Sequence, residues 1–532
     1  MHRYGFLLCF CLAKAPSLHA QNPIIERLSL DSLGIEGNGI SNSVSLSRDQ
    51  RYFVFSSQAD NLVAGDNNQA EDVFLRDRIL GTTTRVSLTS AGLEAQGDSQ
   101  EPRISLNGQF VVFTSTAEDL VPGDTNGTWD VFVRDLSSGQ TEKISLGDQG
   151  QEGTGFSFQP SISEDGRFVS FVSFADNLVP GDSNGSIDLF LHDRLLATTV
   201  RISQGLGGQD SNGNSFGRIS ANGDFVVLES DASNLVAGDG NGFADIFVWE
   251  RSTGGMERVN LGPGGVEADG LSFKAWLSSD GNWVCFSSYA GNLTALDSNP
   301  DADCFLFDRN SGALELVNRN TRGEQGNDYA AELTCSDDGR YVAFQSDADN
   351  LADGILDQWS NVFVRDRQSG VTVLANLNDS GEYGTSSSYV TFPVIDPSGG
   401  VVCFASTASN LVANDQNDVL DIFLRDLQTG GPELQISNLA AGSSALVEVE
   451  GATPSGLVTL AYSFQGQGPT PFVGGLLNLS LPVQTVAMQA DGSGLASMSV
   501  PVPLALAGQE VWAQAVDHQS LMPSSSFYAL IP

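Results

Sequence analysis

The segment Val131-Phe132-Val133-Arg134-Asp135 recurs in seven versions along this 532-residue chain, each a short apolar run that ends in an acid. The closing acids are Asp77, Asp135, Asp193, Glu250, Asp308, Asp366 and Asp426. Successive copies are 58, 58, 57, 58, 58 and 60 residues apart. A period of this size indicates a propeller or a solenoid, because each unit is too small to bury its apolar face alone and must pack on its neighbours.

Other strand-like runs accompany this segment in every unit. In the second unit they include Arg103-Ile104-Ser105, Phe110-Val111-Val112-Phe113 and Thr141-Glu142-Lys143-Ile144-Ser145. Short runs rich in Val, Ile and Phe between Gly, Asn and Asp are typical of β-strands. Because the middle runs are almost continuously apolar, we expect both faces of each four-stranded sheet to be buried, as in blades stacked around an axis.

A count of the strands favours a closed ring. The run of the Arg-Val-Ser type occurs eight times, whereas the other strands occur seven times. The first copy is Ile25-Glu26-Arg27-Leu28-Ser29 and the last lies at residues 433–437, and a surplus terminal strand can complete the blade at the other end of the chain. The sequence therefore predicts an all-β, seven-bladed β-propeller over residues 21–437 and leaves open which copy closes it.

The turn that precedes the second strand carries a family resemblance. Ser163-Glu164-Asp165-Gly166-Arg167-Phe168-Val169 and residues 336–344 resemble the repeats of TolB-type, WD40-like propellers, over roughly residues 24 to 437. Gln50 replaces the turn glycine in the first unit, and the last unit reads Asp396-Pro397-Ser398-Gly399-Gly400. TolB has six blades and an additional α/β domain, which this chain lacks. The resemblance implies the fold, while family members dock proteins and related propellers accompany peptidases or act as polysaccharide lyases.

The two ends of the chain differ from the repeats. Residues 1–20 have the basic start, short apolar core and small residues before Gln21 of a cleaved secretory signal, so we expect an extracytoplasmic protein cut near Ala20. No later stretch is apolar over the roughly 20 residues that a membrane helix needs. Residues 438–532 lack the repeat and contain strand-like runs separated by Gly and Pro, which predict a small C-terminal β-sandwich.

The composition restricts the partners. The chain has 25 basic and 65 acidic residues, a formal charge of −40, which would repel nucleic acids and anionic membranes. The acidity favours solubility, a salty habitat or cation binding. We expect a monomer with a protein or glycan partner. The cysteines of the repeats, Cys285, Cys304, Cys335 and Cys403, replace apolar strand residues and are interpreted as small buried hydrophobes, with a Cys285–Cys304 disulfide as the alternative.

An acidic loop of the form D-x-N-x-x-x-D lies between the second and third strands of six units. Its residues are Asp66, Asn68 and Asp72; Asp124, Asn126 and Asp130; Asp182, Asn184 and Asp188; Asp239, Asn241 and Asp245; Asp297, Asn299 and Asp303; and Asp415, Asn417 and Asp421. The sixth unit has Ile355, Asp357 and Asn361 instead. Alternating oxygen ligands on a tight loop suit calcium, so one hypothesis is a structural calcium site per loop. The alternative is a plain connector, because Asp and Asn also form turns with their own backbone.

A second acidic loop precedes the first strand of five units. It reads G-x-[E/D]-x-x-G-x-S and carries Glu36, Glu94, Glu152, Asp210 and Glu267. Because these loops connect an outer strand to the next inner strand, they gather on one face of the ring. We interpret them as glycine-shaped crossovers whose acids are solvated.

No catalytic motif emerges from the sequence. His192 and His518 are the two histidines after the signal, and His192 takes a strand position that arginine fills in other units. A histidine triad or a zinc site is therefore not expected. Residues that break the repeat near the crossover face are the better binding candidates: Lys274, Trp276, Tyr329, Tyr383 and Tyr389.

The sequence thus favours an exported, non-catalytic binding or scaffold protein. The alternative is an extracellular enzyme, a polysaccharide lyase or hydrolase or a peptidase-like protein, that uses the funnel face of the ring. A surface-structural role, with the C-terminal module as anchor, is the third hypothesis.

Overall fold

The computed structural model describes residues 25–352, 360–384 and 393–427, together with the strand backbones between residues 433 and 530. The chain divides into two units, of which the first ends at Leu427. The expected signal peptide, Ile355, Asp357, Tyr389 and His518 lie outside the described residues.

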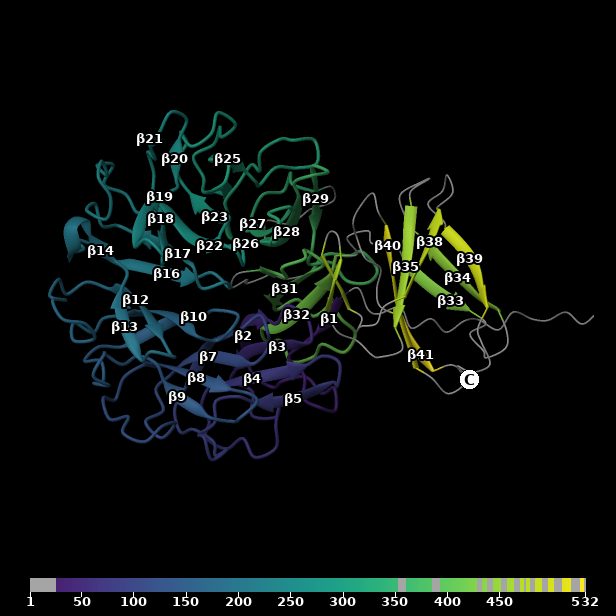
Figure 1. Ribbon diagram of the computed structural model, residues 1–532, viewed down its shortest axis with the longest axis horizontal. Helices are drawn as coiled ribbons and strands as arrows, with labels where there is room; N and C mark the ends of the chain where they lie inside the picture. The colour runs from purple at the N-terminus through teal and green to yellow at the C-terminus, as the bar shows by residue number, and fades with distance from the viewer. Residues whose placement is uncertain are drawn as a thin grey trace, which may run out of the picture. The chain divides into compact units, whose positions relative to one another are not determined.

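The first unit consists of seven four-stranded antiparallel sheets, the blades of a propeller (Figure 1). From the inner to the outer strand, blade one contains β2 (Ser41–Leu46), β3 (Tyr52–Ser57), β4 (Asp72–Asp77) and β5 (Thr82–Arg85). Blade two contains β6 (Ser99–Ile104), β7 (Phe110–Ser115), β8 (Asp130–Asp135) and β9 (Thr141–Lys143). Blade three contains β10 (Ser157–Ile162), β11 (Phe168–Ser173), β12 (Asp188–Asp193) and β13 (Thr198–Arg201).

Blades four to six follow the same order: β16 (Ser215–Ile219), β17 (Phe225–Ser230), β18 (Asp245–Glu250), β19 (Gly255–Arg258); β22 (Ser272–Leu277), β23 (Trp283–Ser288), β24 (Asp303–Asp308), β25 (Ala313–Leu316); and β26 (Ala330–Cys335), β27 (Tyr341–Ser346), β28 (Asn361–Asp366), β29 (Val371–Leu374). The prediction of a seven-bladed, all-β propeller is confirmed.

Blade seven joins the two ends of the propeller. It contains β30 (Val394–Ile395), β31 (Val401–Ser406) and β32 (Asp421–Asp426), and β1 (Ile25–Arg27) pairs with β32 as its outer strand. Figure 1 shows β1 in purple beside β32 in green. Of the two copies that the sequence offered, the N-terminal one therefore closes the ring.

Stacked phenylalanine rings form the centre of the blades. In six blades a Phe of the second strand faces a Phe of the third in register, with ring centroids 5.6–5.9 Å apart. Phe113 and Phe132 are an example, and both are fully buried. Blade four has Leu228 opposite Phe247. Because these rings lie between neighbouring sheets, the nearly continuous apolar runs of the middle strands are explained by burial on both faces.

The motif that resembles TolB is a structural turn between the first two strands. Ser163 Oγ lies 2.6 Å from Asp165 Oδ1 and accepts from the backbone N–H of Phe168 at 2.9 Å. Gly166 has φ +73°, and a Cβ there would lie 2.2 Å from the ring of Phe110 in the preceding blade. The glycine is therefore required by both backbone conformation and close packing.

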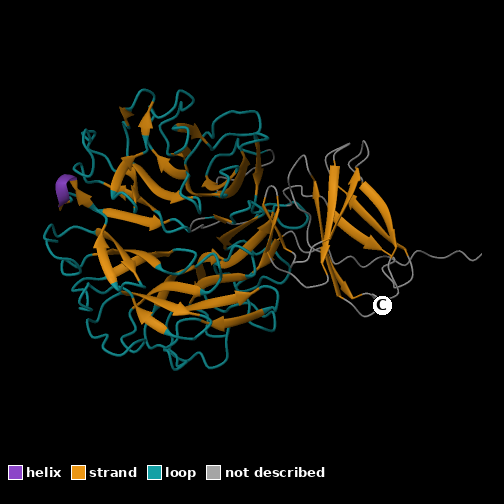
Figure 2. Cartoon of the chain, in the orientation of Figure 1, coloured by secondary structure: helices purple, strands orange, loops and turns teal. Residues whose placement is uncertain are grey.

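Short hairpins connect each blade to the next. They form β14 (Gln204–Gly205) with β15 (Gln209–Asp210) and β20 (Leu261–Gly262) with β21 (Val266–Glu267), and isolated bridges such as Leu88 with Glu94 elsewhere. The described helix is the 3-10 turn η1 (Leu206–Gly208), drawn in purple in Figure 2. Among the described residues no helix has the length and apolarity to cross a membrane.

The second unit is also made of strands. β33 (Glu433–Ser437), β34 (Ser444–Glu450) and β39 (Ala496–Pro501) form one sheet in the order β33-β34-β39. The order β38-β35-β40-β41 describes another, with β35 (Leu457–Ser463), β38 (Gln484–Gln489), β40 (Glu510–Asp517) and β41 (Phe527–Leu530). β36 (Pro469–Phe472) pairs with β37 (Gly475–Asn478). The β-sandwich expected here stays a prediction.

The cysteines of the first unit lie in its core. Cys285, Cys304, Cys335 and Cys403 are buried and free of disulfides. Their interpretation as small buried hydrophobes fits this arrangement.

Candidate functional site

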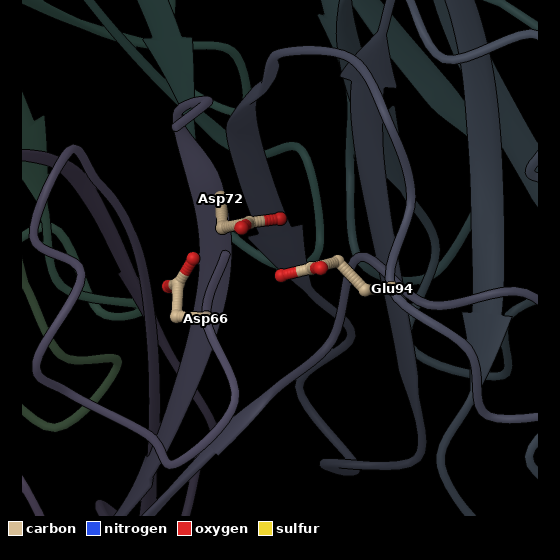
Figure 3. A group of neighbouring side chains, drawn as sticks. All are labelled: Asp66, Asp72 and Glu94. Carbon is tan, nitrogen blue, oxygen red and sulfur yellow. The ribbon is translucent and has the colours of Figure 1, made fainter. Parts of the chain in front are cut away.

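The two acidic loops meet around a buried basic side chain. In blade one, Arg85 at the end of β5 places Nη2 3.0 Å from Asp66 Oδ2, and Nη1 3.3 Å from Asp72 Oδ2 and 2.5 Å from Glu94 Oε1. Figure 3 shows these three carboxylates facing one another, Asp66 and Asp72 from the acidic loop and the start of β4, and Glu94 from the crossover. The Arg85 side chain is 5% exposed, so it serves as the internal counter-ion of this acidic cluster.

Four other blades repeat this arrangement. In each, one base binds three acids: the first acid of the acidic loop, the acid that begins the third strand, and the acid of the crossover loop that leads to the next blade, which we call the crossover acid. The bases and their N–O distances are Lys143 at 2.6–3.0 Å, Arg201 at 2.6–3.4 Å, Arg258 at 2.9–3.1 Å and Arg27 at 2.7–3.2 Å. We call these five groups the basic-centred clusters. Because each includes a crossover acid, each ties a blade to the connection that leads to the next one.

The asparagine that recurs in the acidic loops hydrogen-bonds to its cluster. Asn68 Nδ2 donates to Asp72 Oδ2 at 3.0 Å and to the carbonyl of Ala95 at 2.9 Å, while its Oδ1 accepts from the N–H of Ala70. The side-chain oxygen is therefore engaged in a turn with its own loop. This is the connector geometry that the sequence offered as the alternative to metal binding.

The carboxylates of one cluster differ in acidity. Burial raises the pKa of Asp124 to about 6, although the hydrogen bond and the charge of Lys143 act in the opposite direction. Burial also opposes ionisation of Glu152, but hydrogen bonds from Lys143 and Thr125 outweigh it and lower the pKa of Glu152 to about 2. The crossover acid is thus ionised at neutral pH and paired with a buried base, whereas the sequence analysis interpreted it as solvated.

Blades five and six lack the base together with part of the acids. Leu316 takes the position of Arg85 in blade five, and Gln325 takes that of Glu94. Gln325 Nε2 donates to Asp297 Oδ1 at 2.9 Å and to Asp303 Oδ2 at 2.7 Å. Burial, together with the nearby Asp297, raises the pKa of Asp303 to about 7.

In blade six the described cluster positions carry neither a base nor an acid. The residues at these positions are Leu374, Asn361 and Tyr383. Asn376 Nδ2 donates to Asn361 Oδ1 at 2.8 Å. The candidate Tyr383 therefore belongs to a crossover and takes the place of a cluster acid, so the structure does not bring it together with Lys274.

The calcium hypothesis stays a prediction. In the basic-centred clusters a metal ion would have to share its carboxylates with a guanidinium or ammonium group already within 3.4 Å of them. In blade five, Leu316 leaves Asp297 and Asp303 to the amide of Gln325. Blade five therefore suits a hard divalent cation better than the other blades do.

Sequence reasoning missed the bases of these clusters. Arg27, Arg85, Lys143, Arg201 and Arg258 were assigned only to a strand of the Arg-Val-Ser type. The available signal was a correlation between repeats: a basic residue accompanies a complete set of acids, and leucine accompanies an incomplete set.

The inner strands line the central channel, and bulges direct side chains to its mouth. Register shifts interrupt the first strand in blades one, two, three, five and six. A residue with positive φ lies at each shift: Ser43, Glu101, Gln159, Lys274 and Glu332. Such a conformation is strained for residues other than glycine, and bulges with strain are frequent at functional sites.

Two of the predicted ligand-binding residues lie in this channel. Lys274 and Trp276 belong to β22, and Lys274 Nζ lies 2.9 Å from Glu332 Oε1. Trp276 contacts the guanidinium groups of Arg103 and Arg218, whose Cζ atoms lie 5.8 and 4.8 Å from the centre of its ring. The sequence analysis named neither arginine as a candidate binding residue.

Two groups of contacting aromatic side chains lie at the end of the channel where the first strands begin, in blades three to six. They comprise Phe156, Phe158, Phe174 and Phe216, and Phe273, Tyr289 and Tyr329. We call the two groups together the aromatic arc. Phe156, Phe174 and Tyr289 are exposed by 44, 39 and 44%. The candidate Tyr329 is part of the arc, with its ring centroid 6.5 Å from that of Tyr289.

The arc breaks the sevenfold repeat. In each of blades one to six a backbone hydrogen bond links the residue after the second strand to the residue before the first, which makes these positions comparable. Blade three has Phe174 there, whereas blades one and two have Gln58 and Thr116. The aromatic residues are therefore not required by the fold.

His192 has a structural environment, as predicted. Its Nδ1 lies 3.0 Å from Thr199 Oγ1, where Arg134 of blade two contacts the corresponding Thr141 at 2.9 Å. Burial lowers the pKa of His192. This histidine replaces one of the arginines that tie the third strand to the outer one.

Comparisons with known proteins extend to structures alone. No family model and no curated protein matches the chain. Similar solved structures include a putative TolB from Agrobacterium tumefaciens, 14% identical with a TM-score of 0.34, covering 52% of this chain and 80% of that one. Prolyl oligopeptidase B from Galerina marginata is 11% identical with a TM-score of 0.41, covering 81% of this chain and 57% of that one.

A third similar structure is that of the RRP9 WD40 repeats, which is 10% identical with a TM-score of 0.38 and covers 76% of this chain and 97% of that one. A structure described in an analysis of two prolyl endopeptidases is also similar, at 10% identity and a TM-score of 0.44, covering 87% of this chain and 61% of that one. The seven four-stranded sheets of this chain form a seven-bladed β-propeller. TolB and WD40-repeat propellers are among the solved structures similar to it.

Proposed function

We propose that the chain is an exported, non-catalytic binding protein whose ligand, an extracellular glycan, docks on the aromatic arc. The observation that carries the proposal is the exposure of Phe156, Phe174 and Tyr289 on one side of the channel mouth. Exposed aromatic faces stack on the apolar faces of sugar rings, and neighbouring polar groups fix orientation. Gln159, Glu229 and Lys274 line a pocket beside Phe216 and supply such groups.

The repeat supports this assignment. The basic-centred clusters recur in five blades, which fits a role in holding blades together, whereas the arc is confined to four neighbouring blades. A residue that departs from an internal repeat is free of the constraint that the fold imposes on its counterparts. We therefore assign ligand binding to the aromatic arc, which departs from the repeat.

The test is a glycan array with matched substitutions. Phe174→Thr combined with Tyr289→Thr gives blades three and five the residue of blade two, while Phe243→Thr removes an exposed aromatic of an acidic loop as control. We expect the arc variant to lose array binding at least tenfold and the control to retain it, at melting temperatures close to that of the wild type. Binding unaffected by the arc substitutions, or no glycan binding by the wild type, would reject the proposal.

Export is tested separately. A secretory signal predicts that the mature protein begins near Gln21, which mass spectrometry of the protein isolated from its native cell resolves. A retained Met1 would contradict export.

An enzymatic role is the second candidate. Glu229 and Glu332 lie on either side of Lys274, whose backbone N–H donates to Glu229 Oε2 at 2.8 Å and whose Nζ binds Glu332. Burial raises the pKa of both carboxyl groups, as is common for general acids in glycoside chemistry. Release of new chain ends from a polysaccharide panel, abolished by Glu332→Gln, would establish an enzyme and overturn the non-catalytic assignment.

A further inference from the structure

The central channel contains two guanidinium groups that share one indole. Arg103 from β6 and Arg218 from β16 approach Trp276 of β22, so three blades meet at this point. Arg103 Nη1 has long contacts of 3.4 and 3.3 Å to the carbonyls of Val44 and Pro102. The chain has a formal charge of −40, yet these two positive side chains lie close enough in the channel to repel each other.

The surroundings of the two arginines strengthen the electrostatic field of their charges, although burial also disfavours the charged form. They line one pocket together with an aliphatic ring formed by Leu46, Ile104, Ile162, Ile219, Leu277 and Ile395. Apolar walls exclude water and strengthen the field of a charge within them. Burial, and secondarily the charge of Arg218, lowers the pKa of Arg103 to about 9.

The acids near these arginines have donors of their own. Glu101 Oε2 accepts from the N–H of Gln159 at 2.7 Å, and Glu229 and Glu332 bind the backbone and the ammonium group of Lys274. Glu101 also favours the charged form of both guanidinium groups, and Glu229 and Glu332 that of Arg218. These acids favour the charged form of the arginines. Their own hydrogen bonds hold them beside the bulges of the first strands.

The far end of the channel is bridged by an ion-pair group. Arg48 of blade one lies 2.8 Å from Asp337 of blade six and 3.3 Å from Glu164 of blade three. Asp337, the acid in the pocket of the two arginines, also accepts from the N–H of Ser279. Because this group closes one end of the channel in the described part of the chain, we place the entry to Arg103 and Arg218 at the opposite end, on the side of the aromatic arc.

We propose that Arg103 and Arg218 form a binding site for a carboxylate group of the ligand, with Trp276 as the platform that positions them. Guanidinium groups match the planar fork of a carboxylate and bind it through paired hydrogen bonds. Both side chains are half-buried, so they are enclosed yet still reached from the channel. The inference rests on the proposed function, because it places an acidic group of the docked ligand below the aromatic arc.

Small carboxylates test the site by calorimetric titration of the full chain. Glucuronate represents a sugar acid and N-acetylalanine the end of a peptide, with methyl glucoside and N-acetylalaninamide as uncharged counterparts. We expect at least one carboxylate to bind, neither uncharged counterpart to bind, and Arg103→Gln or Arg218→Gln to weaken binding at least tenfold. Tighter binding of glucuronate identifies a sugar acid as the source of the carboxylate, and tighter binding of N-acetylalanine identifies a chain terminus.

The control is Arg309→Gln, because Arg309 also lies over an aromatic ring, that of Phe225 at 4.3 Å, but outside the channel. If the glutamine variants do not fold, a crystal structure of the wild type with the bound carboxylate decides the matter, with oxygens expected about 3 Å from both guanidinium groups. Absence of carboxylate binding, or binding unchanged by both substitutions, overturns the inference. Array binding that needs the aromatic arc but not the arginines would leave the proposed function standing and reject this site alone.

Discussion

Blade three and blade five balance the charge of equivalent acids in different ways. In blade three, Arg201 neutralises Asp182, Asp188 and Asp210, with N–O distances of 2.6–3.4 Å. In blade five, Leu316 replaces the arginine, and Gln325 bridges the two remaining acids. The comparison shows that the acids of these loops are tolerated in the interior only with a base, an amide or a retained proton to balance them.

The largest effect is expected when the base is removed from blade three. Arg201→Leu copies blade five but leaves three carboxylates around an apolar side chain, so the free energy of unfolding should fall by about 3–5 kcal/mol. Denaturant unfolding at pH 7 measures the change. Arg309→Leu breaks a single pair with the exposed Glu257 and a hydrogen bond to the carbonyl of Gly281, and it should cost less, about 1–2 kcal/mol. Equal losses in the two variants would contradict the role assigned to Arg201.

A smaller effect of pH should distinguish blade five. The pKa of Asp303 is raised to about 7 in the folded chain, against about 3.9 when unfolded. Between about pH 4 and pH 7 the folded chain keeps a proton on Asp303 that the unfolded chain has released. The contribution of this proton to the free energy of unfolding is therefore lost as the pH rises from about 4 to 7, and above about pH 7 it no longer changes.

Asp303→Asn should therefore match the wild type near pH 4 and be more stable at pH 7, by up to about 2 kcal/mol. Unfolding at both pH values tests this. Asp188→Asn in blade three removes a partner of Arg201 and should be destabilised at pH 7 instead. An Asp303→Asn variant less stable than the wild type at pH 7 would contradict the account.

The smallest expected effect is that of calcium. A site with a dissociation constant of about 1 mM would stabilise the chain by only about 1 kcal/mol at 5 mM calcium. Melting in calcium and in chelator measures the shift. If it arises in blade five, Leu316→Arg, which supplies the missing base, should abolish it, whereas Leu374→Arg in blade six should not. No shift in the wild type and no bound metal by mass spectrometry would remove the calcium hypothesis.

The sequence predicted the fold well because the repeat carries it redundantly. Phe113, Phe132 and the turn glycines recur with the period, so each strand is indicated several times over. Closure by residues 25–27 was undecided, since residues 433–437 offer a similar strand and only pairing with β32 distinguishes them. Patterns within one unit cannot resolve a contact between the two ends of a ring.

The site was predicted only in part. Lys274, Trp276 and Tyr329 stood out as departures from the repeat and do lie at the channel and its mouth. Arg103 and Arg218 escaped notice because each resembles a strand residue until the ring places it opposite Trp276. The crossover acids were read as solvated, since their bases lie 9 residues away along the chain and meet them only through the hairpin.

The most direct test of the central claim, that a base organises each acidic cluster, is a double-mutant cycle in blade three. It combines Arg201→Leu with Asp210→Gln, which together reproduce the residues of blade five, and measures unfolding at pH 7. The account predicts that the double variant is more stable than the sum of the single losses implies, with a coupling of about 1.5 kcal/mol or more. Losses that add within about 0.5 kcal/mol would show that Arg201 and Asp210 act independently and would contradict it.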